Sequence, residues 1–377
     1  MARIKVELPA SPAGGKERSY DILVGIDSLA DLGEIIEKLS WCQDILIITD
    51  PQVNNLYGDK LRCGLKNIKN STIEVPRGER YKNLQTASKL YDALAKNSAH
   101  RDSMIIALGG GVIGDLAGFA AATYMRGIRY VQVPTTLLAQ VDAAIGGKTG
   151  VNHPKCKNLI GSFYQPGLVF IDVKTLTTLP ARELRTGLAE VVKYGVIEDA
   201  DFFKFLEANS HHLNTKAFEA PDTLRAALKV WEIIVAESAK IKANIVARDE
   251  TEQGLRMILN FGHTIGHAIE TLTKYYAYNH GEAVAIGMVA AAKIARHLDL
   301  LDKESVQRIV NLLDKVGLAT QAGGLSARKV VQALGIDKKV IKGKLRFVVP
   351  EKIGKVVIKD NIPTRIITQA LLETGCK

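Results

Sequence analysis

Cysteine and aromatic residues are scarce in this chain of 377 residues. The four cysteines, Cys42, Cys63, Cys156 and Cys376, form no Cys-x-x-Cys pair and have no spacing typical of a metal site. This pattern favours reduced thiols in a cytosolic protein over a disulfide framework. Aromatic residues make up 6% of the chain and do not alternate with basic residues, as they often do in nucleic-acid binding segments.

An uninterrupted hydrophobic run of membrane-spanning length is also missing. The longest apolar stretch, residues 103–124, contains five glycines and Asp115, which favours a buried strand, turn and helix. The first eight residues have the pattern of a strand and not that of a signal peptide. We therefore predict a soluble, cytoplasmic protein with no membrane partner.

Positive charge is in excess but is not concentrated. The formal net charge is +10, yet Lys and Arg are scattered singly, with no block of five or six. Such scattering argues against a nucleic-acid partner. An anionic small substrate would account for several of these side chains, and a solvated surface for the others.

The length and the order of predicted elements indicate two domains. Up to about residue 180, β-branched segments alternate with helical ones, which predicts a largely parallel sheet covered by helices. The predicted strands are 4–8, 20–24, 44–49, 104–108, 129–133 and 168–172, and the helices include 83–96 and 112–124. The first two strands could form an edge hairpin through a turn at residues 12–15. We therefore assign residues 1–180 to an α/β domain.

Beyond residue 180 the pattern becomes mainly helical. Long amphipathic stretches predict helices at 182–196, 223–247, 259–274, 282–298 and 303–316, with strands only at 344–349 and 355–358. We therefore assign residues 181–377 to a mainly α-helical domain.

A glycine-rich turn follows one of the predicted strands. The segment is Gly109-Gly-Gly-Val-Ile-Gly-Asp115, which matches G-x-G-x-x-G between a strand and a helix. Small residues there would let backbone N–H groups approach a pyrophosphate, although such glycines also occur in simple tight turns. Asp50, after another strand, could meet a ribose or could cap the next helix.

Three separated segments carry side chains suited to a divalent metal. Glu190 and Lys193 are three residues apart on one helix face, and His263 and His267 are four apart on another. His280 lies at a predicted helix start, so three of the eight histidines fall within 18 positions. Two imidazoles and one carboxylate suit an ion such as Zn²⁺ with open coordination positions. The spacing leaves open which three residues bind it. A His-Glu-x-x-His protease motif is absent because Thr264 takes the place of the glutamate.

At these residues the chain resembles the 3-dehydroquinate synthase family over nearly its whole length. Six motifs occur in order: Arg77-Gly-Glu-Arg-Tyr-Lys82, Gly109-Gly-Gly-Val-Ile-Gly-Asp115, the stretch from Val133-Pro-Thr-Thr136 to Gly146-Gly-Lys-Thr-Gly-Val-Asn152, Leu188-Ala-Glu-Val-Val-Lys-Tyr194, Asn260-Phe-Gly-His263 with His267, and His280-Gly-Glu-Ala-Val284. One departure is Arg77, where the family commonly has aspartate.

The resemblance implies an N-terminal Rossmann-like α/β domain and a helical C-terminal domain, with an active site in the cleft between them. It also implies NAD, one Zn²⁺ or Co²⁺, and a homodimer. By the same resemblance the metal ligands are Glu190, His263 and His280, and His267 has an outer or proton-handling role. The implied NAD-site residues are Asp50, Glu79, Lys82, Gly110, Gly111, Val112, Asp115, Thr135, Thr136, Lys148, Lys157, Thr175, Leu176, Thr177 and Thr178.

The substrate that the resemblance implies is 3-deoxy-D-arabino-heptulosonate 7-phosphate, an anion at both ends. The positions that match its phosphate end are Arg126, Lys148, Asn158, Asn260 and Lys338, with Arg126 supplied either by the same subunit or by a partner subunit. Lys242 and Arg256 match the carboxylate end, and Asp142 and Lys193 would orient hydroxyls. The implied catalytic residues are Lys148, Lys193, His267, Asp142 and Lys242.

The implied reaction is the second step of the shikimate pathway, toward chorismate and the aromatic amino acids. It consists of transient oxidation by NAD, elimination of phosphate, reduction, and an intramolecular aldol closure to 3-dehydroquinate. The alternatives are a related cyclase that makes an inosose or a valiolone, and a metal-dependent polyol dehydrogenase, which would release NADH. Asn260, Lys338 and residues 343–347 favour the dehydroquinate reaction.

Overall fold

The computed structural model describes residues 1–9, 18–219, 221–274, 277–340 and 345–377, with backbone only for Pro221 and residues 336–340. The chain forms two compact units. The first contains Met1–Leu179 and Trp231–Thr251, and the second contains Pro180–Val230 and Glu252–Lys377. The sequence had placed every residue after 180 in the second domain, but the contacts group Trp231–Thr251, most of it the C-terminal part of one long helix, with the first unit.

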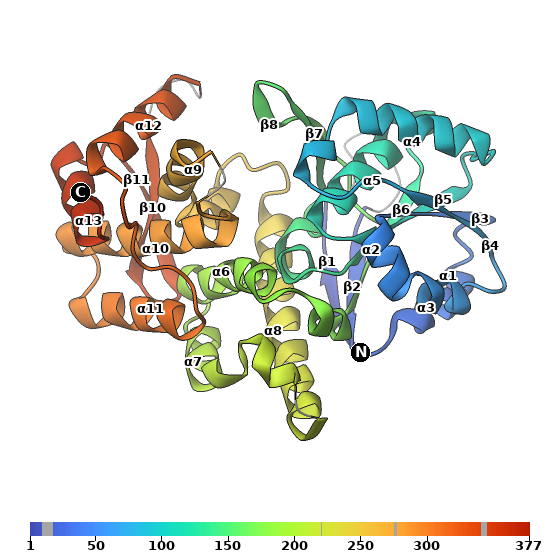
Figure 1. Ribbon diagram of the computed structural model, residues 1–377, viewed down its shortest axis with the longest axis horizontal. Helices are drawn as coiled ribbons and strands as arrows, with labels where there is room; N and C mark the ends of the chain where they lie inside the picture. The colour runs from blue at the N-terminus through green and yellow to red at the C-terminus, as the bar shows by residue number, and fades with distance from the viewer. Residues whose placement is uncertain (10–17, 220, 275–276, 341–344) are drawn as a thin grey trace. The chain divides into compact units, whose positions relative to one another are not determined.

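A sheet of seven strands, counted among the described residues, forms the centre of the first unit (Figure 1). The strand order is β1-β2-β9-β6-β5-β3-β4, with β1 antiparallel to β2 and the other neighbours parallel. The strands are β1 (Ala2–Val6), β2 (Tyr20–Gly25), β3 (Asp44–Thr49), β4 (Lys69–Glu74), β5 (Ser103–Gly109), β6 (Arg129–Pro134) and β9 (Leu168–Asp172). The parallel sheet and the edge pairing of the first two strands are therefore confirmed, while the predicted turn at 12–15 lies outside the described residues.

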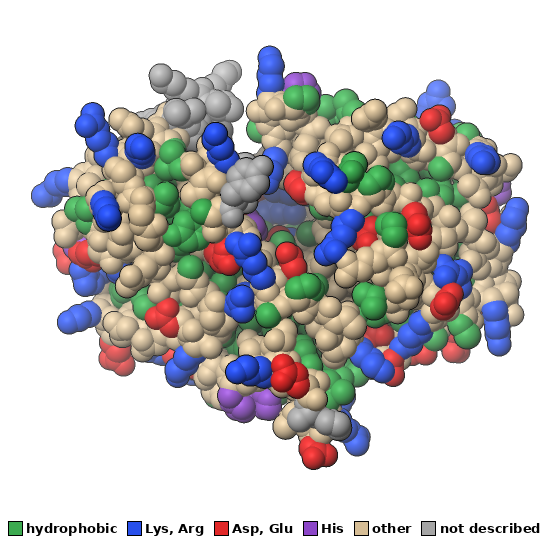
Figure 2. Space-filling view, in the orientation of Figure 1, with side chains coloured by type: hydrophobic (Ala, Val, Ile, Leu, Met, Phe, Trp, Pro, Cys, Tyr) green, Lys and Arg blue, Asp and Glu red, His purple; other side chains and the backbone are tan. Residues whose placement is uncertain are grey.

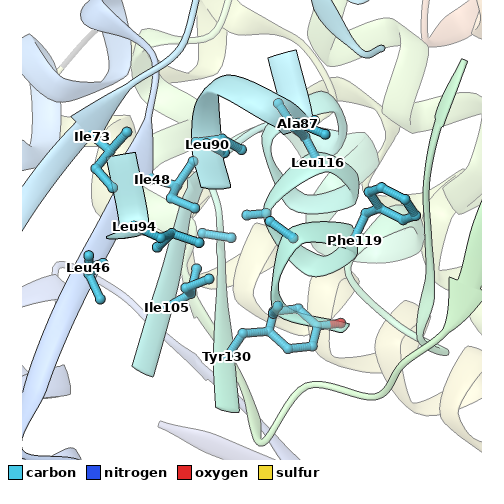
Figure 3. Close-up of a cluster of buried hydrophobic side chains, with 14 of the residues drawn as sticks. Leu46, Ile48, Ile73, Ala87, Leu90, Leu94, Ile105, Leu116, Phe119 and Tyr130 are labelled. Atoms are coloured by element: carbon cyan, nitrogen blue, oxygen red, sulfur yellow. The ribbon is translucent and has the colours of Figure 1, made fainter. Parts of the chain in front are cut away.

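Helices cover both faces of this sheet, so its inner strands β3, β5 and β9 are buried on both sides. They are α1 (Leu32–Leu39), α2 (Pro51–Val53), α3 (Asp59–Gly64), α4 (Leu84–Lys96) and α5 (Gly111–Thr123). Figure 3 shows α4 and α5 packed on one face through Leu90, Leu94 and Leu116. On β3, Leu46 and Ile48 point to this cluster, whereas Ile45 and Ile47 join a second cluster with Leu32 and Ile36 of α1. The alternation follows from the two-residue period of a strand, and each such buried side chain contributes about 1.5–3 kcal/mol.

The second unit is mainly helical. Its elements are α6 (Ala181–Ile197), α7 (Ala200–Ala208), α9 (His263–Leu272), α10 (His280–His297), α11 (Lys303–Lys315), α12 (Ala327–Val340), α13 (Thr364–Glu373) and the hairpin β10 (Arg346–Lys352) with β11 (Lys355–Asp360). Helix α8 (Pro221–Arg248) contributes to both units. In Figure 1, α9, α10 and β10 lie side by side, in agreement with their contacts. The predicted α/β and helical fold classes are confirmed.

Several local features differ from the sequence prediction, which also had no helices at the positions of α7, α12 and α13. The strand β4 and the hairpin of β7 (Lys148–His153) with β8 (Cys156–Phe163) were not predicted; most residues of β4 and β8 are exposed or only partly buried. Helix α9 begins at His263 and not at residue 259, because Gly262 adopts a left-handed conformation with φ of 81°. Residues 259–260 instead end a short 3₁₀ helix, η9 (Leu255–Asn260).

Surface charge is distributed over both units. Figure 2 shows Lys and Arg side chains interspersed with Asp and Glu on the visible face. No helix in the described part of the chain is both long and apolar enough to cross a membrane. The apolar stretch at 103–124 forms β5 and α5 with the glycine turn between them, as the sequence predicts.

Candidate active site

Glycines bring three helices of the second unit unusually close together. A Cβ on Gly287 of α10 would lie 1.9 Å from the carbonyl oxygen of Gly262, just before α9. A Cβ on Gly281, in the first turn of α10, would lie 2.5 Å from Cα of Thr186 on α6. Only glycine allows backbones to approach so closely. The start of α9 is therefore held against the middle of α10, and the start of α10 is held against α6.

Three candidate metal ligands converge where these helices meet. Nε2 of His263 lies 3.4 Å and Nε2 of His280 lies 3.6 Å from Oε1 of Glu190. One donor atom from each residue lies within 4.8 Å of the other two. A tetrahedral ion with bonds of about 2.1 Å holds its donors about 3.4 Å apart. The donor set and its spacing therefore fit one divalent ion with at least one open position.

The electrostatic surroundings differ between the two histidines. Burial lowers the pKa of His263 to about 3, so its imidazole is neutral and can offer a lone pair. Burial also opposes charge on His280, but the carboxylates of Glu190 and Glu270 outweigh it and raise the pKa of His280 to about 10. A metal ion at this place would supply the positive charge between these carboxylates that a proton otherwise provides.

Lys193 and His267 border the same cluster. Lys193 is fully buried and its Nζ donates to Oε2 of Glu190, one helical turn away on α6. The ring of His267 is exposed and meets that of His263 edge-on, with centroids 5.4 Å apart. The structure thus brings together all five residues that the sequence grouped as metal-site candidates.

The second unit also contains three residues predicted to bind the ends of the substrate. Arg256 is 2% exposed on η9, and Nδ2 of Asn260 donates to Glu252 at 3.2 Å. The backbone of Lys338 belongs to α12, but its side chain lies outside the described residues.

In the first unit, ten of the predicted NAD residues follow the carboxyl ends of parallel strands. Asp50 follows β3, Gly110 to Val112 follow β5, Thr135 and Thr136 follow β6, and Thr175 to Thr178 follow β9 in a 3₁₀ helix. The carboxyl ends of parallel strands share one edge of a sheet, which is where α/β folds bind nucleotides. Asp50 also caps α2 by accepting from the backbone of Gln52 and Val53, so the capping alternative is observed.

The glycine-rich turn leads directly into helix α5, and its glycines leave room for close contacts. Gly110 is the N-cap of α5, so backbone N–H groups of the first turn point outward from the strand end. A Cβ on Gly114 would lie 2.7 Å from Oε1 of Gln132 on β6, so this glycine lets the helix pack on the sheet. Both features match the physical roles of a dinucleotide-binding turn.

Two polar clusters of the first unit unite further predicted residues. Nζ of Lys82 donates to Asp115 and, at 2.6 Å, to Oδ1 of Asn158. Burial raises the pKa of Asp115, and Lys82 opposes that effect. Nζ of Lys242 donates to Oδ1 of Asp142 at 2.6 Å.

The remaining predicted residues of the first unit lie on loops and strand ends. Oε1 of Glu79 accepts from Asn152, Lys148 begins β7, and Lys157 is exposed on β8. Arg126 and Asn158 have positive φ of 64° and 52°, a conformation that non-glycine residues adopt rarely and often at functional sites. Lys242 and Arg256, both predicted at the substrate carboxylate, belong to different units.

Two buried residues of these sites were missed by the sequence reasoning. Glu270 lies on α9 with Oε1 3.4 Å from Nδ1 of His280. Its position three residues after His267 would have placed it on the same helix face. Gln140 is fully buried and donates to Oγ1 of Thr175 at 2.9 Å, and no sequence pattern pointed to it.

Comparison with known proteins gives consistent results for both units. The family models for the N-terminal and C-terminal parts of 3-dehydroquinate synthase match residues 72–186 and 187–340. The 3-dehydroquinate synthase of Nostoc punctiforme is 49% identical over 371 residues, which cover 98% of each chain.

Two solved structures share the fold. One is 2-epi-5-epi-valiolone synthase from Streptomyces hygroscopicus subsp. jinggangensis with NAD⁺ and Zn²⁺ bound, with a TM-score of 0.83, 29% identity, and coverage of 96% of this chain and 98% of that one. The other is 2-deoxy-scyllo-inosose synthase with carbaglucose-6-phosphate, NAD⁺ and Co²⁺, with a TM-score of 0.83, 26% identity, and coverage of 99% and 100%.

The chain therefore shares the fold of sugar phosphate cyclases, and both of these structures hold NAD⁺ and a divalent metal ion. The two cyclase structures have the same TM-score, so sequence identity, which is 49% for the relative from Nostoc punctiforme, is what identifies the family within this class. The chain belongs to the 3-dehydroquinate synthase family.

Proposed function

We propose that the chain converts 3-deoxy-D-arabino-heptulosonate 7-phosphate into 3-dehydroquinate and phosphate, as a carbon–oxygen lyase. The observation that carries this proposal is the 49% identity to a 3-dehydroquinate synthase over 98% of both chains. The valiolone and inosose synthases share the fold at only 29% and 26% identity.

The two bound groups are NAD and one divalent metal ion. When bound, NAD takes a hydride from a substrate carbon and returns it, and the metal lowers the pKa of a substrate hydroxyl. Glu190, His263 and His280 would hold the metal, since their donor atoms have the required chemistry and spacing. The residues proposed to hold NAD are the strand-end group, Asp50, Gly110, Gly111, Val112, Thr135, Thr136, Thr175, Leu176, Thr177 and Thr178, together with Glu79, Lys82, Asp115, Lys148 and Lys157.

The residues around the metal ligands would orient the hydroxyls. Lys193 fixes one oxygen of Glu190 by its hydrogen bond, so the other oxygen faces the two imidazoles. A lysine in this position can also donate to a hydroxyl that approaches the cluster. His267, exposed beside His263, can exchange a proton with the substrate or with water.

The anionic ends of the substrate require donors with fixed geometry. We assign the carboxylate to Arg256 and Lys242, because a guanidinium can bind a carboxylate through two parallel hydrogen bonds. Asp142 holds the Lys242 ammonium in place by accepting hydrogen bonds through its carboxylate and its backbone carbonyl. We assign the phosphate to Arg126, Lys148, Asn158, Asn260 and Lys338.

The main alternative is a valiolone- or inosose-type cyclase, because those enzymes have the same fold. A substrate panel separates the two functions: the heptulosonate phosphate, sedoheptulose 7-phosphate and glucose 6-phosphate, each with NAD and Co²⁺. We expect phosphate release only from the heptulosonate phosphate, which alone has a carboxylate. Faster turnover of either carboxylate-free sugar would contradict the proposal and support the alternative.

A further inference from the structure

A buried carboxylate lies behind the candidate metal ligand His280. Glu270 is on α9 and is 6% exposed, and its Oε1 lies 3.4 Å from Nδ1 of His280. Nε2 on the other side of the same ring faces Glu190. The imidazole of His280 is therefore placed between two carboxylates, each beside a different ring nitrogen.

The second candidate ligand, His263, has a parallel arrangement. Its Nδ1 lies 3.2 Å from the backbone carbonyl oxygen of Phe261, and its Nε2 faces Glu190. On both rings, an acceptor beside Nδ1 keeps a proton on that nitrogen and leaves the lone pair of Nε2 directed to the cluster. Histidine ligands in metalloproteins commonly hydrogen-bond through their other ring nitrogen in this way, which fixes the tautomer and the ring orientation.

We propose that Glu270 is a positioning residue of the metal centre: it holds His280 with Nδ1 protonated and Nε2 directed to the ion that Glu190 and His263 also bind. The inference rests on the metal centre of the proposed function. Phe261 does the same for His263 through a backbone oxygen, which a side-chain substitution cannot remove. Glu270 is therefore the position at which this support can be tested.

A direct ligand role for Glu270 is the competing arrangement. His267, Glu270 and His280 also have donor atoms within 4.8 Å of one another. That set would use Nδ1 of His280 and the exposed ring of His267, whereas the set with Glu190 combines a fully buried carboxylate with the ring of His263, whose side chain is only 13% exposed. The set with Glu190 contains no exposed ligand, and this favours it, because desolvated ligands compete with less water for the ion.

The test measures Co²⁺ binding to the full-length, metal-free protein by competition with a chromophoric chelator, without substrate or NAD. Glu270→Gln keeps the size of the side chain and removes its charge, and Glu270→Leu also removes the acceptor. We expect each variant to bind one Co²⁺ with affinity about 10–100-fold below wild type, and the Leu variant to be the weaker. The visible spectrum of the bound Co²⁺ should keep the band pattern of the wild type, because the three ligands remain.

A second carboxylate close to His280 in the sequence provides a matched control. Glu282→Gln changes a carboxylate in the same first turn of α10, and glutamine preserves its capping interaction with Asn279. Its Co²⁺ affinity should remain within a few fold of wild type. Unchanged affinity in both Glu270 variants, or loss of Co²⁺ as complete as in Glu190→Ala, would overturn the positioning role. A wild-type protein that binds Co²⁺ but does not act on the heptulosonate phosphate would instead count against the proposed function alone.

Discussion

The buried pair of Glu190 and Lys193 allows a quantitative test of the cluster in the metal-free protein. The two side chains are 1% and 2% exposed and hydrogen-bond each other across one helical turn of α6. Glu190→Gln keeps the shape of the side chain but leaves the Lys193 ammonium buried without its counter-charge. Breaking a buried pair from one side costs about 3–5 kcal/mol. For a unit of this size, this lowers the melting temperature by roughly 6–20 °C.

The double variant Glu190→Gln, Lys193→Met separates the charge pair from the ligand role. Removing both charges together leaves no uncompensated ion, so the melting temperature should recover to within a few degrees of wild type. Metal binding should not recover, because the carboxylate ligand is still missing. The assay is thermal unfolding of the metal-free variants, with Zn²⁺ titration of each.

The pair of Asp201 and Lys204 on α7 serves as a control. It has the same three-residue spacing but exposed side chains, with N and O 2.9 Å apart. Asp201→Asn should leave the melting temperature close to that of wild type, because exposed ion pairs contribute little to stability. A double variant at 190 and 193 that is as unstable as the sum of its single variants would refute the coupling of the buried pair.

Four further predictions concern substrate binding, helix packing and the oligomeric state. Arg256→Ala should lose about ten- to a hundredfold in kcat/KM with the heptulosonate phosphate, because charged hydrogen bonds contribute about 1.5–3 kcal/mol, and should lose little with an analogue lacking the carboxylate. Lys338→Ala should show the reverse with an analogue lacking the phosphate, and equal losses on both analogues would show that the assignment is wrong. Gly281→Ala would place a Cβ 2.5 Å from Thr186, so it should move His280 and weaken Zn²⁺ binding at least tenfold; unchanged affinity would contradict the close-packing argument. Light scattering should find the homodimer that the family resemblance implies, and a monomer at micromolar concentration would exclude it.

The sequence predicted the central sheet well because its strands are strongly apolar. β3 and β9 were placed at their observed bounds, since both are buried on two sides. β4 was missed because five of its six residues are polar or only partly buried. The start of α9 was misplaced because hydrophobic periodicity continues through Gly262, whose left-handed conformation ends one helical segment before the next begins. A hydrophobic pattern does not show whether one residue within it adopts a positive φ angle.

For the metal site, the sequence predicted the residues but not their geometry. Glu190, His263, His267 and His280 were grouped from residue type and clustering. Which nitrogen faces which carboxylate depends on how α9 meets α10, and the sequence spacing does not contain that geometry. Glu270 was missed because a glutamate near the end of an amphipathic helix is more often a solvated residue, and only the packing of α9 on α10 places it beside His280.

The most direct test of the proposed function is the ratio of product formed to NAD supplied. Purified protein with Co²⁺ would be incubated with an excess of heptulosonate phosphate and a small fraction of one equivalent of NAD, and phosphate and 3-dehydroquinate would be quantified together. Because the hydride is returned within each cycle, we predict equal amounts of both products, many times the NAD present, and no steady rise of NADH absorbance. NADH that accumulates in step with substrate consumption, with no carbocyclic product, would contradict the account and indicate a dehydrogenase.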